Sequence, residues 1–573
     1  MFQGGAVIEF LFNGEPVTES NLDPDLTILR YLRTKKGSMG TKEGCASGDC
    51  GACTVLVGER LAPAADRGID YRAVNACIAL VGSLHGKHLV TVEGLAGPDD
   101  ALHPVQRAMV DNHASQCGFC TPGIVMSLAA LHESAADNNV DNVLEALSGN
   151  LCRCTGYRPI IDAGLKSRTY AGAGNGLGIG TGVDDSLDNT SPNVPGKPPG
   201  SDFSNTSSSV PDLAPDSGFE KTPGSVLDTA VSSVLHKTAN GAGPDNAFVK
   251  AQSHWPEIGD RQAPALVSPL GRCVYPRSER ELKHCIEAMP AARFIAGGTD
   301  LLLEVTQSYR RLPQLIGLAD VAELKTHSVT DNVISLGGAL SYTDVCAVLR
   351  EPLPEVVALL HRFGSRQIRN RGTLGGNLAN ASPIGDMPPL LLALDAELEL
   401  STVTARRRVA VADFYLDYKK TLLQPGEYIR RIIIPRPAAG DFFKCYKVSK
   451  RFEDDISAVM LALRWRLQQG VITEVCLAYG GMAAIPKRAA GAEAVLLGQP
   501  LEAAAIEQAA AALAGDFSPL SDVRASSQYR LRVAGRLLHK AFLACRAPGV
   551  AIDRLDDRQY QSPARSATQS WPS

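Results

Sequence analysis

The sequence predicts an α+β protein of several domains, in which a small, mostly β module and a bundle of four helices precede a linker and two α+β regions. Three observations predict this order. Eight of the fourteen cysteines lie in two groups before residue 155, apolar residues change to helical spacing near Pro104, and residues 167–265 have the composition of a linker. A length of 573 residues allows roughly three to five domains, each with its own core. The predicted boundaries are 1–95, 96–166, 167–265, 266–440, 441–546 and 547–573.

The first module begins with a predicted hairpin. The runs 7–12 and 15–18 flank an Asn-Gly pair, which supplies the positive φ angles of a two-residue turn. Asp25 or Thr27 is expected to cap a short helix that follows. Strands are expected at 54–57 and 89–93, and they would complete the module.

A glycine-rich loop carries Cys45, Cys50 and Cys53, with Cys77 as the natural fourth thiol. This C-x4-C-x2-C spacing with a distant fourth cysteine is that of plant-type ferredoxins, which hold a 2Fe-2S cluster. Glycines let the backbone fold closely around a cluster and direct N–H groups at its sulfurs. The alternative is a structural zinc knuckle, although zinc sites usually pair thiols as two C-x2-C units. The glycines in question are Gly37, Gly40, Gly44, Gly48 and Gly51.

Cys117, Cys120, Cys152 and Cys154 form a second set of four ligands. Cys152 and Cys154 are too close in sequence to bridge each other comfortably, and a shared metal centre removes that difficulty. A four-helix bundle that holds one cluster between its helix ends is the simplest interpretation. The four helices are expected to begin at Pro104, at Thr121 as N-cap with Pro122 at N1, at Asp141 as N-cap, and at Arg158-Pro159, the last running to about Lys166.

Residues 167–265 are expected to be a disordered linker, because a composition rich in Pro, Ser, Gly and Asn cannot bury enough apolar surface to fold. Within it, residues 226–236 would place six apolar side chains on one helical face. This face indicates either a docking helix or a transient helix of no consequence. The tail 547–573 is also expected to be disordered.

Two glycine loops follow the linker. The strand 293–296 leads into Gly297-Gly298-Thr299-Asp300, which is how phosphates are often cradled, although one such turn is a weak signal. The second loop, 371–377, again bunches backbone donors and is followed by 382–386. Two such loops in one region favour a dinucleotide site.

The last region is predicted to be an α+β cap. Strands are expected at 442–448, 456–466 and 472–479, followed by helices near 501–514 and 522–545. Six cysteines outside the two ligand sets are interpreted as buried small hydrophobes: Cys273, Cys285, Cys346, Cys445, Cys476 and Cys545.

Composition excludes several functional classes. A net charge of −4 without a basic cluster argues against nucleic acid as a partner. No apolar run approaches the roughly 20 residues of a membrane span, and the N-terminus lacks a charged segment followed by an apolar one. A cytoplasmic location is therefore expected, and free thiols in ligand spacing fit its reducing conditions.

Together, these motifs resemble the iron–sulfur and flavin subunit of bacterial members of the molybdenum hydroxylase family. The resemblance covers nearly the whole chain outside the linker and tail, and it is carried by the runs 45–55, 116–123 and 149–159 and by the two glycine loops. It implies a ferredoxin-like β-grasp 2Fe-2S domain, a four-helix 2Fe-2S domain, a two-part α+β FAD-binding domain and an α+β C-terminal domain. The linker is longer than expected for the family.

The resemblance also implies roles for single residues. Phe363 would stack on the isoalloxazine ring, and the run 453–456 resembles the segment beside the flavin that influences access of NAD. One 2Fe-2S cluster would be held by Cys45, Cys50, Cys53 and Cys77, and the other by Cys117, Cys120, Cys152 and Cys154. The residues expected to contact FAD are Phe294, Ile295, Ala296, Gly297, Gly298, Thr299, Asp300, Leu301, Phe363, Thr373, Leu374, Gly375, Gly376, Asn377, Asp386, Ile429 and Lys447.

The function implied by the resemblance is an electron relay. A purine such as hypoxanthine or xanthine would be hydroxylated on a large molybdopterin-binding partner subunit, and its electrons would pass through the clusters and FAD to NAD. No catalytic residue for purine hydroxylation is then expected in this chain, because nothing after Cys545 could be the molybdopterin domain. A heterotetramer or a higher hetero-oligomer is expected. One alternative is that the same relay serves a partner that oxidises an aldehyde or another N-heterocycle. Oxygen could replace NAD as the electron acceptor. A different class of function is a zinc-stabilised scaffold without electron transfer.

Overall fold

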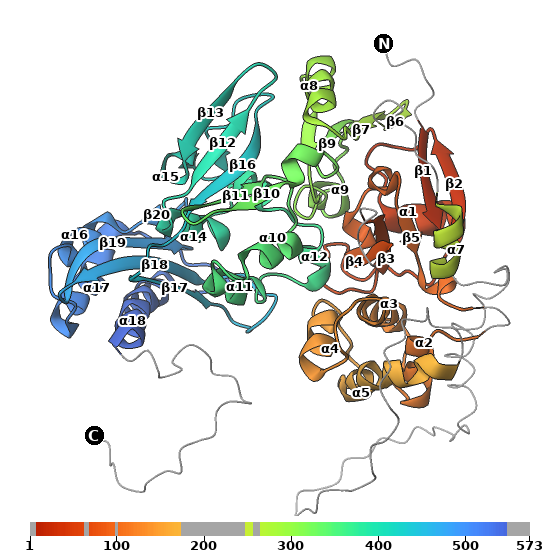
Figure 1. The fold of residues 1–573 in the computed structure, drawn as a ribbon, viewed down its shortest axis with the longest axis horizontal. Coiled ribbons are helices and arrows are strands. Elements are labelled where there is room, and N and C mark those ends of the chain that lie inside the picture. Colours follow the sequence, from red (N-terminus) through yellow and green to blue (C-terminus); the bar gives the residue numbers. More distant parts are fainter. Residues whose placement is uncertain (1–6, 62–67, 98–100, 174–246, 256–263, 547–573) are drawn as a thin grey trace, which may run out of the picture.

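The computed structural model describes residues 7–61, 68–97, 101–173, 247–255 and 264–546. It confirms the multidomain α+β class. The two cysteine-bearing modules lie together at one end, and the larger α+β part extends away from them (Figure 1). Within the described ranges, no helix has both the length and the apolar character required to cross a bilayer.

The first module is a five-stranded β-grasp sheet in the order β2-β1-β5-β3-β4. The predicted hairpin is confirmed, with Asn13 at φ 50° and Gly14 at φ 87° in the turn between antiparallel β1 and β2. Thr27, rather than Asp25, caps the first helix by accepting a hydrogen bond from Arg30 N. The strands are β1 Val7–Phe12, β2 Glu15–Ser20, β3 Thr54–Arg60, β4 Ile69–Asn75 and β5 His88–Val90; the helical segments are α1 Ile28–Tyr31, η1 Leu32–Lys36, η2 Ala76–Ile78, η3 Val81–Leu84 and η4 Val92–Gly94.

The second module is the predicted bundle of four helices, with two caps different from those expected. Asn139, not Asp141, caps the third helix, because its side chain accepts from Asn142 N. Cys120 occupies the N-cap position expected for Thr121, whose hydroxyl instead shares a hydrogen bond with Ser115. The helical segments are α2 Pro104–Asp111, α3 Thr121–His132, α4 Val140–Leu147, α5 Arg158–Lys166 and η6 Ser167–Ala173.

The ordered chain extends into both ends of the stretch predicted to be a linker. Helix α7, Ala247–His254, lies against β1 and β2, and buries Phe248 between the rings of Tyr71 and His103 at centroid distances of 4.8 and 6.0 Å. This one aromatic side chain thus contacts both cysteine-bearing modules. Eight residues are too short a window for composition to reveal such a helix. The helical face predicted at 226–236 and the tail 547–573 lie outside the described residues.

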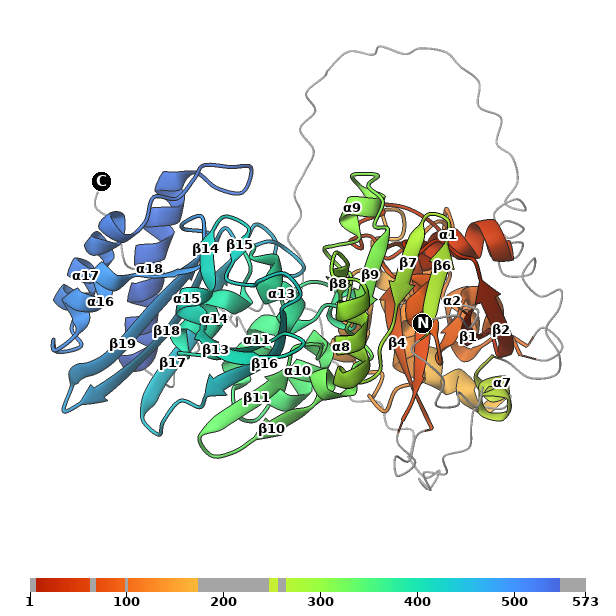
Figure 2. The same ribbon diagram turned by 90° about the horizontal axis from the view of Figure 1, so that it is seen from above.

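The following region has two lobes. The first lobe is a sheet in the order β6-β7-β9-β8 that lies beside the β-grasp sheet (Figure 2). Its Leu266, Tyr275 and Ile295 share one apolar core with Ile8 and Phe10 of the first module. Its elements are β6 Ala265–Ser268, β7 Gly271–Val274, α8 Glu279–Ala288, β8 Arg293–Ile295, α9 Leu303–Thr306, β9 Gln314–Gly317 and η7 Ala322–Lys325.

The second lobe is a five-stranded antiparallel sheet in the order β10-β11-β16-β12-β13, with helices packed over one apolar core. Its strands are β10 His327–Val329, β11 Val333–Gly337, β12 Glu397–Ser401, β13 Arg406–Ala410, β16 Tyr428–Pro435 and the short pair β14 Tyr415–Asp417 and β15 Lys420–Thr421. Its helices are α10 Tyr342–Leu349, α11 Pro354–Leu360, α12 Arg366–Arg369, α13 Leu374–Asn380, α14 Met387–Ala393 and α15 Val411–Phe414.

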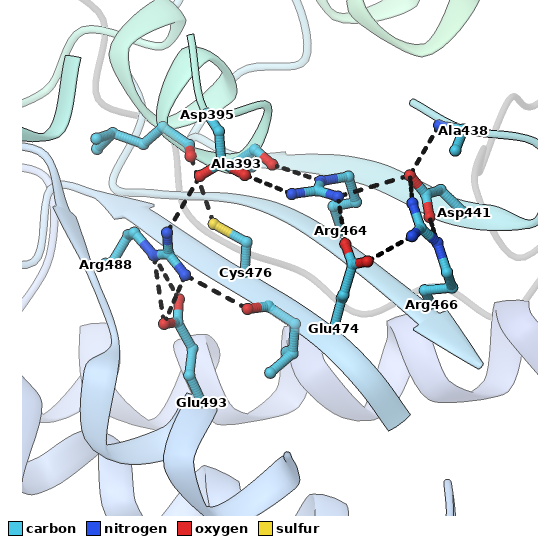
Figure 3. Close-up of polar contacts among 12 residues, drawn as sticks. Ala393, Asp395, Ala438, Asp441, Arg464, Arg466, Glu474, Cys476, Arg488 and Glu493 are labelled. Carbon is cyan, nitrogen blue, oxygen red and sulfur yellow. Dashed lines mark hydrogen bonds and ion pairs between the residues drawn. The ribbon is translucent and has the colours of Figure 1, made fainter. Parts of the chain in front are cut away.

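The C-terminal region is the predicted α+β cap, a sheet in the order β17-β18-β19-β20 covered by helices. Across the strands of this sheet, Arg464, Arg466 and Arg488 form a network of ion pairs with four carboxylates, and Asp395 of this network follows α14 (Figure 3). The network therefore fastens the cap to the second lobe. The elements are β17 Asp441–Val448, β18 Val459–Gln468, β19 Val471–Gly480, β20 Lys487–Arg488, α16 Ala490–Leu496, α17 Ala503–Asp516 and α18 Ser527–Arg546.

The prediction of six buried cysteines outside the ligand sets is correct for only half of them. Cys273, Cys285 and Cys476 are buried, whereas the others lie at the margins of their cores and remain partly exposed. The partly exposed cysteines are Cys346, Cys445 and Cys545.

Candidate iron–sulfur and flavin sites

The four thiols of the first cysteine set lie close together as two pairs. Cys45 and Cys50 lie close enough to shift the pKa of each other's thiol, and the Sγ atoms of Cys53 and Cys77 are 3.3 Å apart. The N–H groups of Ser47 and Asp49 point at Cys45 Sγ from 3.4 and 3.3 Å. These contacts are the N–H to sulfur bonds that the glycine-rich loop predicts.

The same contacts favour the ligand form of Cys45. The neighbouring Cys50 thiol and the N–H groups of Ser47 and Asp49 lower the pKa of Cys45, whereas Cys45 and burial raise the pKa of Cys50. A thiolate, not a thiol, binds metal. Cys45 is therefore the thiol of this pair that more readily takes the ligand form.

The second cysteine set is also arranged as two pairs. Cys117 and Cys154 lie close enough to shift the pKa of each other's thiol, and so do Cys120 and Cys152. The N–H of Cys152 donates to Tyr157 Oη at 2.8 Å, which fixes the ligand loop between α4 and α5. Cys117 and Cys154 are exposed, whereas Cys152 is buried. One side of this site therefore faces the surface.

The pairwise arrangement distinguishes a two-iron centre from a single zinc ion. A tetrahedral zinc ion with Zn–S bonds near 2.3 Å would bring its four sulfurs to within about 3.8 Å of one another. Among the residues that the structure describes, only His103, His132 and Glu133 bring three possible ligand atoms within 4.8 Å of one another. No three thiols do so, and two separated pairs are what a centre with two iron atoms needs.

The two cysteine loops touch through their backbones. The N–H of Leu151, next to Cys152, donates to the carbonyl oxygen of Cys50 at 3.0 Å. The side chain of Asn150 donates to Gly51 O at 3.2 Å. The bond from Leu151 to Cys50 therefore links the first cysteine set directly to the residue beside Cys152 of the second set.

The first cysteine loop also touches the α+β region that follows the linker. Gln307 Nε2 donates to the carbonyl oxygens of Cys45 and Ala46, each at 3.0 Å. On the same loop, Gly48 lies against the side chain of Ile368. The first cysteine loop thus contacts both the second cysteine loop and the α+β region that carries the two glycine loops.

The first glycine loop has free backbone donors. In the described chain, none of the N–H groups of residues 297–301 has a hydrogen-bond acceptor. A Cβ on Gly297 would overlap the carbonyl oxygen of Arg371, so glycine is needed for the two loops to meet here. Five consecutive N–H groups without acceptors in the described chain are available as donors to phosphate oxygens.

The second glycine loop carries an unpaired buried side-chain oxygen. Thr373 caps α13 by accepting from Gly376 N at 3.1 Å, and Gly375 N donates to Gly338 O at 3.1 Å. Asn377 Oδ1 is buried and has no partner. An orphaned buried acceptor beside a glycine loop is costly unless a ligand completes it. Both loops therefore fit a bound dinucleotide such as FAD.

Asp386 and Lys447, both expected to contact FAD, form an ion pair with each other. Lys447 Nζ lies 2.6 Å from Asp386 Oδ2, their side chains are 2% and 3% exposed, and Ser457 Oγ also donates to Asp386. Ile429 is buried in β16 within the core of the second lobe. Whether these three residues contact FAD remains a prediction.

Phe363 is half-buried, and its ring lies 4.6 Å from that of Tyr342. Burial raises the pKa of Tyr342, and the negative charge of nearby Asp386 raises it further. Tyr342 therefore lies near both Phe363 and the Asp386–Lys447 pair. Arg362 stacks on Phe452 at 4.3 Å and donates to its carbonyl oxygen, which holds the segment 453–456 near Phe363.

Sequence reasoning missed the polar residues that join the modules. Gln307, Gln367 and Arg369 carry no motif, because their partners lie more than 200 residues away. Asn150 did carry a signal, since it lies two residues before Cys152 in the run 149–159.

Family models match most of the described chain. Residues 10–82 match the 2Fe-2S iron-sulfur cluster binding domain, and residues 91–165 match the [2Fe-2S] binding domain. Residues 269–437 match the FAD binding domain in molybdopterin dehydrogenase, and residues 444–545 match the CO dehydrogenase flavoprotein C-terminal domain.

Similar proteins carry related names. Xanthine dehydrogenase of Drosophila subobscura is 34% identical over 95% of this chain and 39% of its own length. Xanthine dehydrogenase/oxidase of Gallus gallus is 32% identical over 90% of this chain and 38% of its own length. The chain thus spans about two fifths of these curated relatives. A carbon monoxide dehydrogenase from Hydrogenophaga pseudoflava is 27% identical, over 49% of this chain and 99% of that one, with a TM-score of 0.46.

Proposed function

We propose that this chain is a member of the molybdenum hydroxylase family, as the matches to two 2Fe-2S domains and to a FAD binding domain in molybdopterin dehydrogenase support, and that it is the iron–sulfur and flavin subunit of a bacterial-type xanthine dehydrogenase. One observation carries the proposal. The two cysteine loops are joined by the hydrogen bond from Leu151 N to Cys50 O. Gln307 binds the first loop to residues 264–546, the part of the chain proposed to hold FAD and called the flavin part below. Electron transfer needs such adjacent sites, whereas a scaffold does not.

Each cofactor has proposed ligands among the residues already described. Cys45, Cys50, Cys53 and Cys77 hold one 2Fe-2S cluster, and Cys117, Cys120, Cys152 and Cys154 hold the other. The N–H groups of residues 297–301 and the loop 373–377 hold the FAD phosphates, and Phe363 stacks on the flavin ring. When bound, the clusters supply one-electron carriers, and FAD accepts one or two electrons and gives a hydride to NAD.

The second cysteine set is the proposed entry point. Its Cys117 and Cys154 are exposed, and Phe119 and Leu151 beside them are 47% and 56% exposed. Exposed apolar side chains around exposed ligands favour contact with another protein. We propose a large molybdopterin-binding subunit as this partner, in a heterotetramer or a higher hetero-oligomer in the cytoplasm.

The partner would set the substrate. A purine is proposed on the strength of the xanthine dehydrogenase relatives, and an aldehyde or another N-heterocycle would use the same relay. The segment 453–456 is held beside Phe363, which supports a role in the access of NAD to the flavin.

The test is cofactor analysis of the purified full chain. Two clusters and one flavin require about four iron atoms and one FAD per chain, with no zinc. NADH added without oxygen should bleach the visible spectrum. Cys152→Ser should lower iron to about two atoms, whereas Cys545→Ser, outside both sets, should leave four. Zinc in place of iron would favour the scaffold. Bound cofactors without bleaching by NADH would point to another acceptor.

A further inference from the structure

Helix α12, Arg366–Arg369, lies where the flavin part meets both cysteine-bearing modules (Figure 1). Three polar contacts dock it on the helical module. Arg366 N donates to Ser148 Oγ at 3.0 Å, Gln367 donates to Ser127 and Asn150, and Arg369 pairs with Glu145. The sequence on either side of α12 leads directly to the proposed flavin residues at 363 and 373–377.

Gln367 is the central contact, and it is completely buried. Its Nε2 donates to Asn150 Oδ1 at 2.9 Å and to Ser127 Oγ at 3.0 Å. Ser127 Oγ donates to Asn150 Oδ1 at 2.6 Å, and Asn150 Nδ2 donates to Gly51 O at 3.2 Å. The four groups therefore form one buried network across three modules.

Both ends of this network reach cluster ligand loops. Asn150 lies two residues before Cys152, and Gly51 lies between Cys50 and Cys53. A single side chain from the flavin part thus contacts, through Asn150, the ligand loops of both cysteine sets.

The orientation of the Gln367 amide is fixed by its partners. Asn150 Oδ1 can only accept, so the Gln367 nitrogen must face it. Gln367 Oε1 is then left buried without a partner, against Gly149. A Cβ on Gly149 would overlap Ser365 and Gln367, and Gly149 has a φ of 102°. Among the described residues the chain leaves this buried oxygen unsatisfied, and it has a glycine where no side chain would fit, which argues that the position of the amide matters.

We propose that Gln367 is a positioning residue for both iron–sulfur sites, supplied by the flavin part of the chain. It orients Asn150, and Asn150 holds the Gly51 carbonyl and the adjoining contact between Leu151 and Cys50. Partners outside the ligand shell orient metal ligands and tune potentials, and their loss typically costs 10–100-fold in metal affinity or activity. This inference rests on the proposed function, because it requires that both cysteine sets hold clusters.

The test compares three full-chain variants with the wild type. Gln367→Met keeps the volume and removes the donor. Gln367→Glu keeps the shape and adds a negative charge between the sites. The matched control is Asn370→Met, which removes another buried amide of the same interface: Asn370 Nδ2 donates to Ala73 O in β4 at 2.9 Å, and its Oδ1 accepts from Thr343 at 2.7 Å.

Two quantities are measured: the midpoint potentials of both clusters, by dithionite titration followed by electron paramagnetic resonance, and the rate of iron release to a chelator. Both Gln367 variants are expected to release iron about tenfold faster from both sites. Because burial raises the pKa of a carboxyl group, the potentials of Gln367→Glu are measured as a function of pH, and both are expected to fall as the carboxyl ionises, since a nearby negative charge disfavours added electrons. Asn370→Met should leave both quantities unchanged.

Each other outcome has a distinct meaning. A wild type without two 2Fe-2S signals would refute the proposed function itself. If the wild type shows both signals, two results would overturn the positioning role. One is that both Gln367 variants keep the wild-type potentials and iron release. The other is that only one of the two clusters changes. An equal effect of Asn370→Met would also overturn it, because docking in general would then be the cause. If Gln367→Met fails to fold, Gln367→Glu still decides the question.

Discussion

Replacing Lys447 by Met should strongly destabilise the flavin part of the chain. The change deletes the ammonium group that lies 2.6 Å from Asp386 and leaves that carboxylate with Ser457 as its only side-chain hydrogen-bond donor in the described chain. Both members of the pair are at most 3% exposed, so water cannot replace the lost partner. Removal of one partner from a buried ion pair costs about 3–5 kcal/mol, because the other charge stays buried and uncompensated.

Thermal unfolding followed by circular dichroism measures this cost. For a unit of 150–250 residues, 1 kcal/mol shifts the midpoint by about 2–4 °C, so Lys447→Met should lower the transition by roughly 6–20 °C. Lys444→Met is the matched control on the same strand. Its ion pair with Glu355 is partly exposed, with side-chain exposures of 20% and 35%, and such pairs contribute about 1 kcal/mol or less.

The double variant Asp386→Asn/Lys447→Met separates lost charge from lost packing. Because no charge is left buried, it should be more stable than Lys447→Met alone. The reasoning fails if Lys447→Met costs no more than Lys444→Met, or if the double variant is the less stable of the two.

Three further predictions concern the flavin region. Gly297→Ala should destabilise the fold by about 1–3 kcal/mol and lower bound FAD, because its Cβ would overlap the Arg371 carbonyl. Gly515→Ala, in helix α17 with open space around it, should leave FAD unchanged and should not lower the melting temperature, because alanine favours a helix more than glycine does. Burial raises the pKa of Asp454 from 3.8 to about 6, so the native state loses stability as the pH rises through this range, and Asp454→Asn should raise the melting temperature at pH 8 but not at pH 4. Phe363→Ala should weaken FAD binding roughly tenfold in a flavin titration while iron content stays unchanged, and full flavin retention would contradict the stacking role.

Local sequence signals predicted much of the fold. The Asn-Gly turn, the change of period near Pro104 and the three strands of the C-terminal cap are all present, because each depends on neighbouring residues. Helix caps were predicted less well. Asn139 and Asp141 are both good capping residues two positions apart, and only the packing of the bundle decides which of them caps α4.

The candidate site was predictable only to the level of its motifs. Cysteine spacing identified which thiols gather, but not that they lie as the pairs Cys45–Cys50 and Cys53–Cys77. Nor does any local pattern place Gln367 against Asn150, which is 217 residues earlier in the chain. Such contacts form only when folded modules pack against each other. A single polar residue buried at that interface leaves no periodic pattern in the sequence that could predict it.

Non-covalent contacts, rather than the linker, hold the modules in place. The first lobe shares an apolar core with the β-grasp module through Tyr275, α7 places Phe248 against both cysteine-bearing modules, and α12 fastens the helical module to the second lobe. Entropy of loop closure grows only slowly with length, so a long connection costs little once these contacts form. A linker longer than the family suggests is therefore compatible with fixed distances between the cysteine loops and the flavin loops. Under the proposed function, a looser interface at α12 would disturb electron transfer, because that interface has the cysteine loops on one side and the proposed flavin residues on the other.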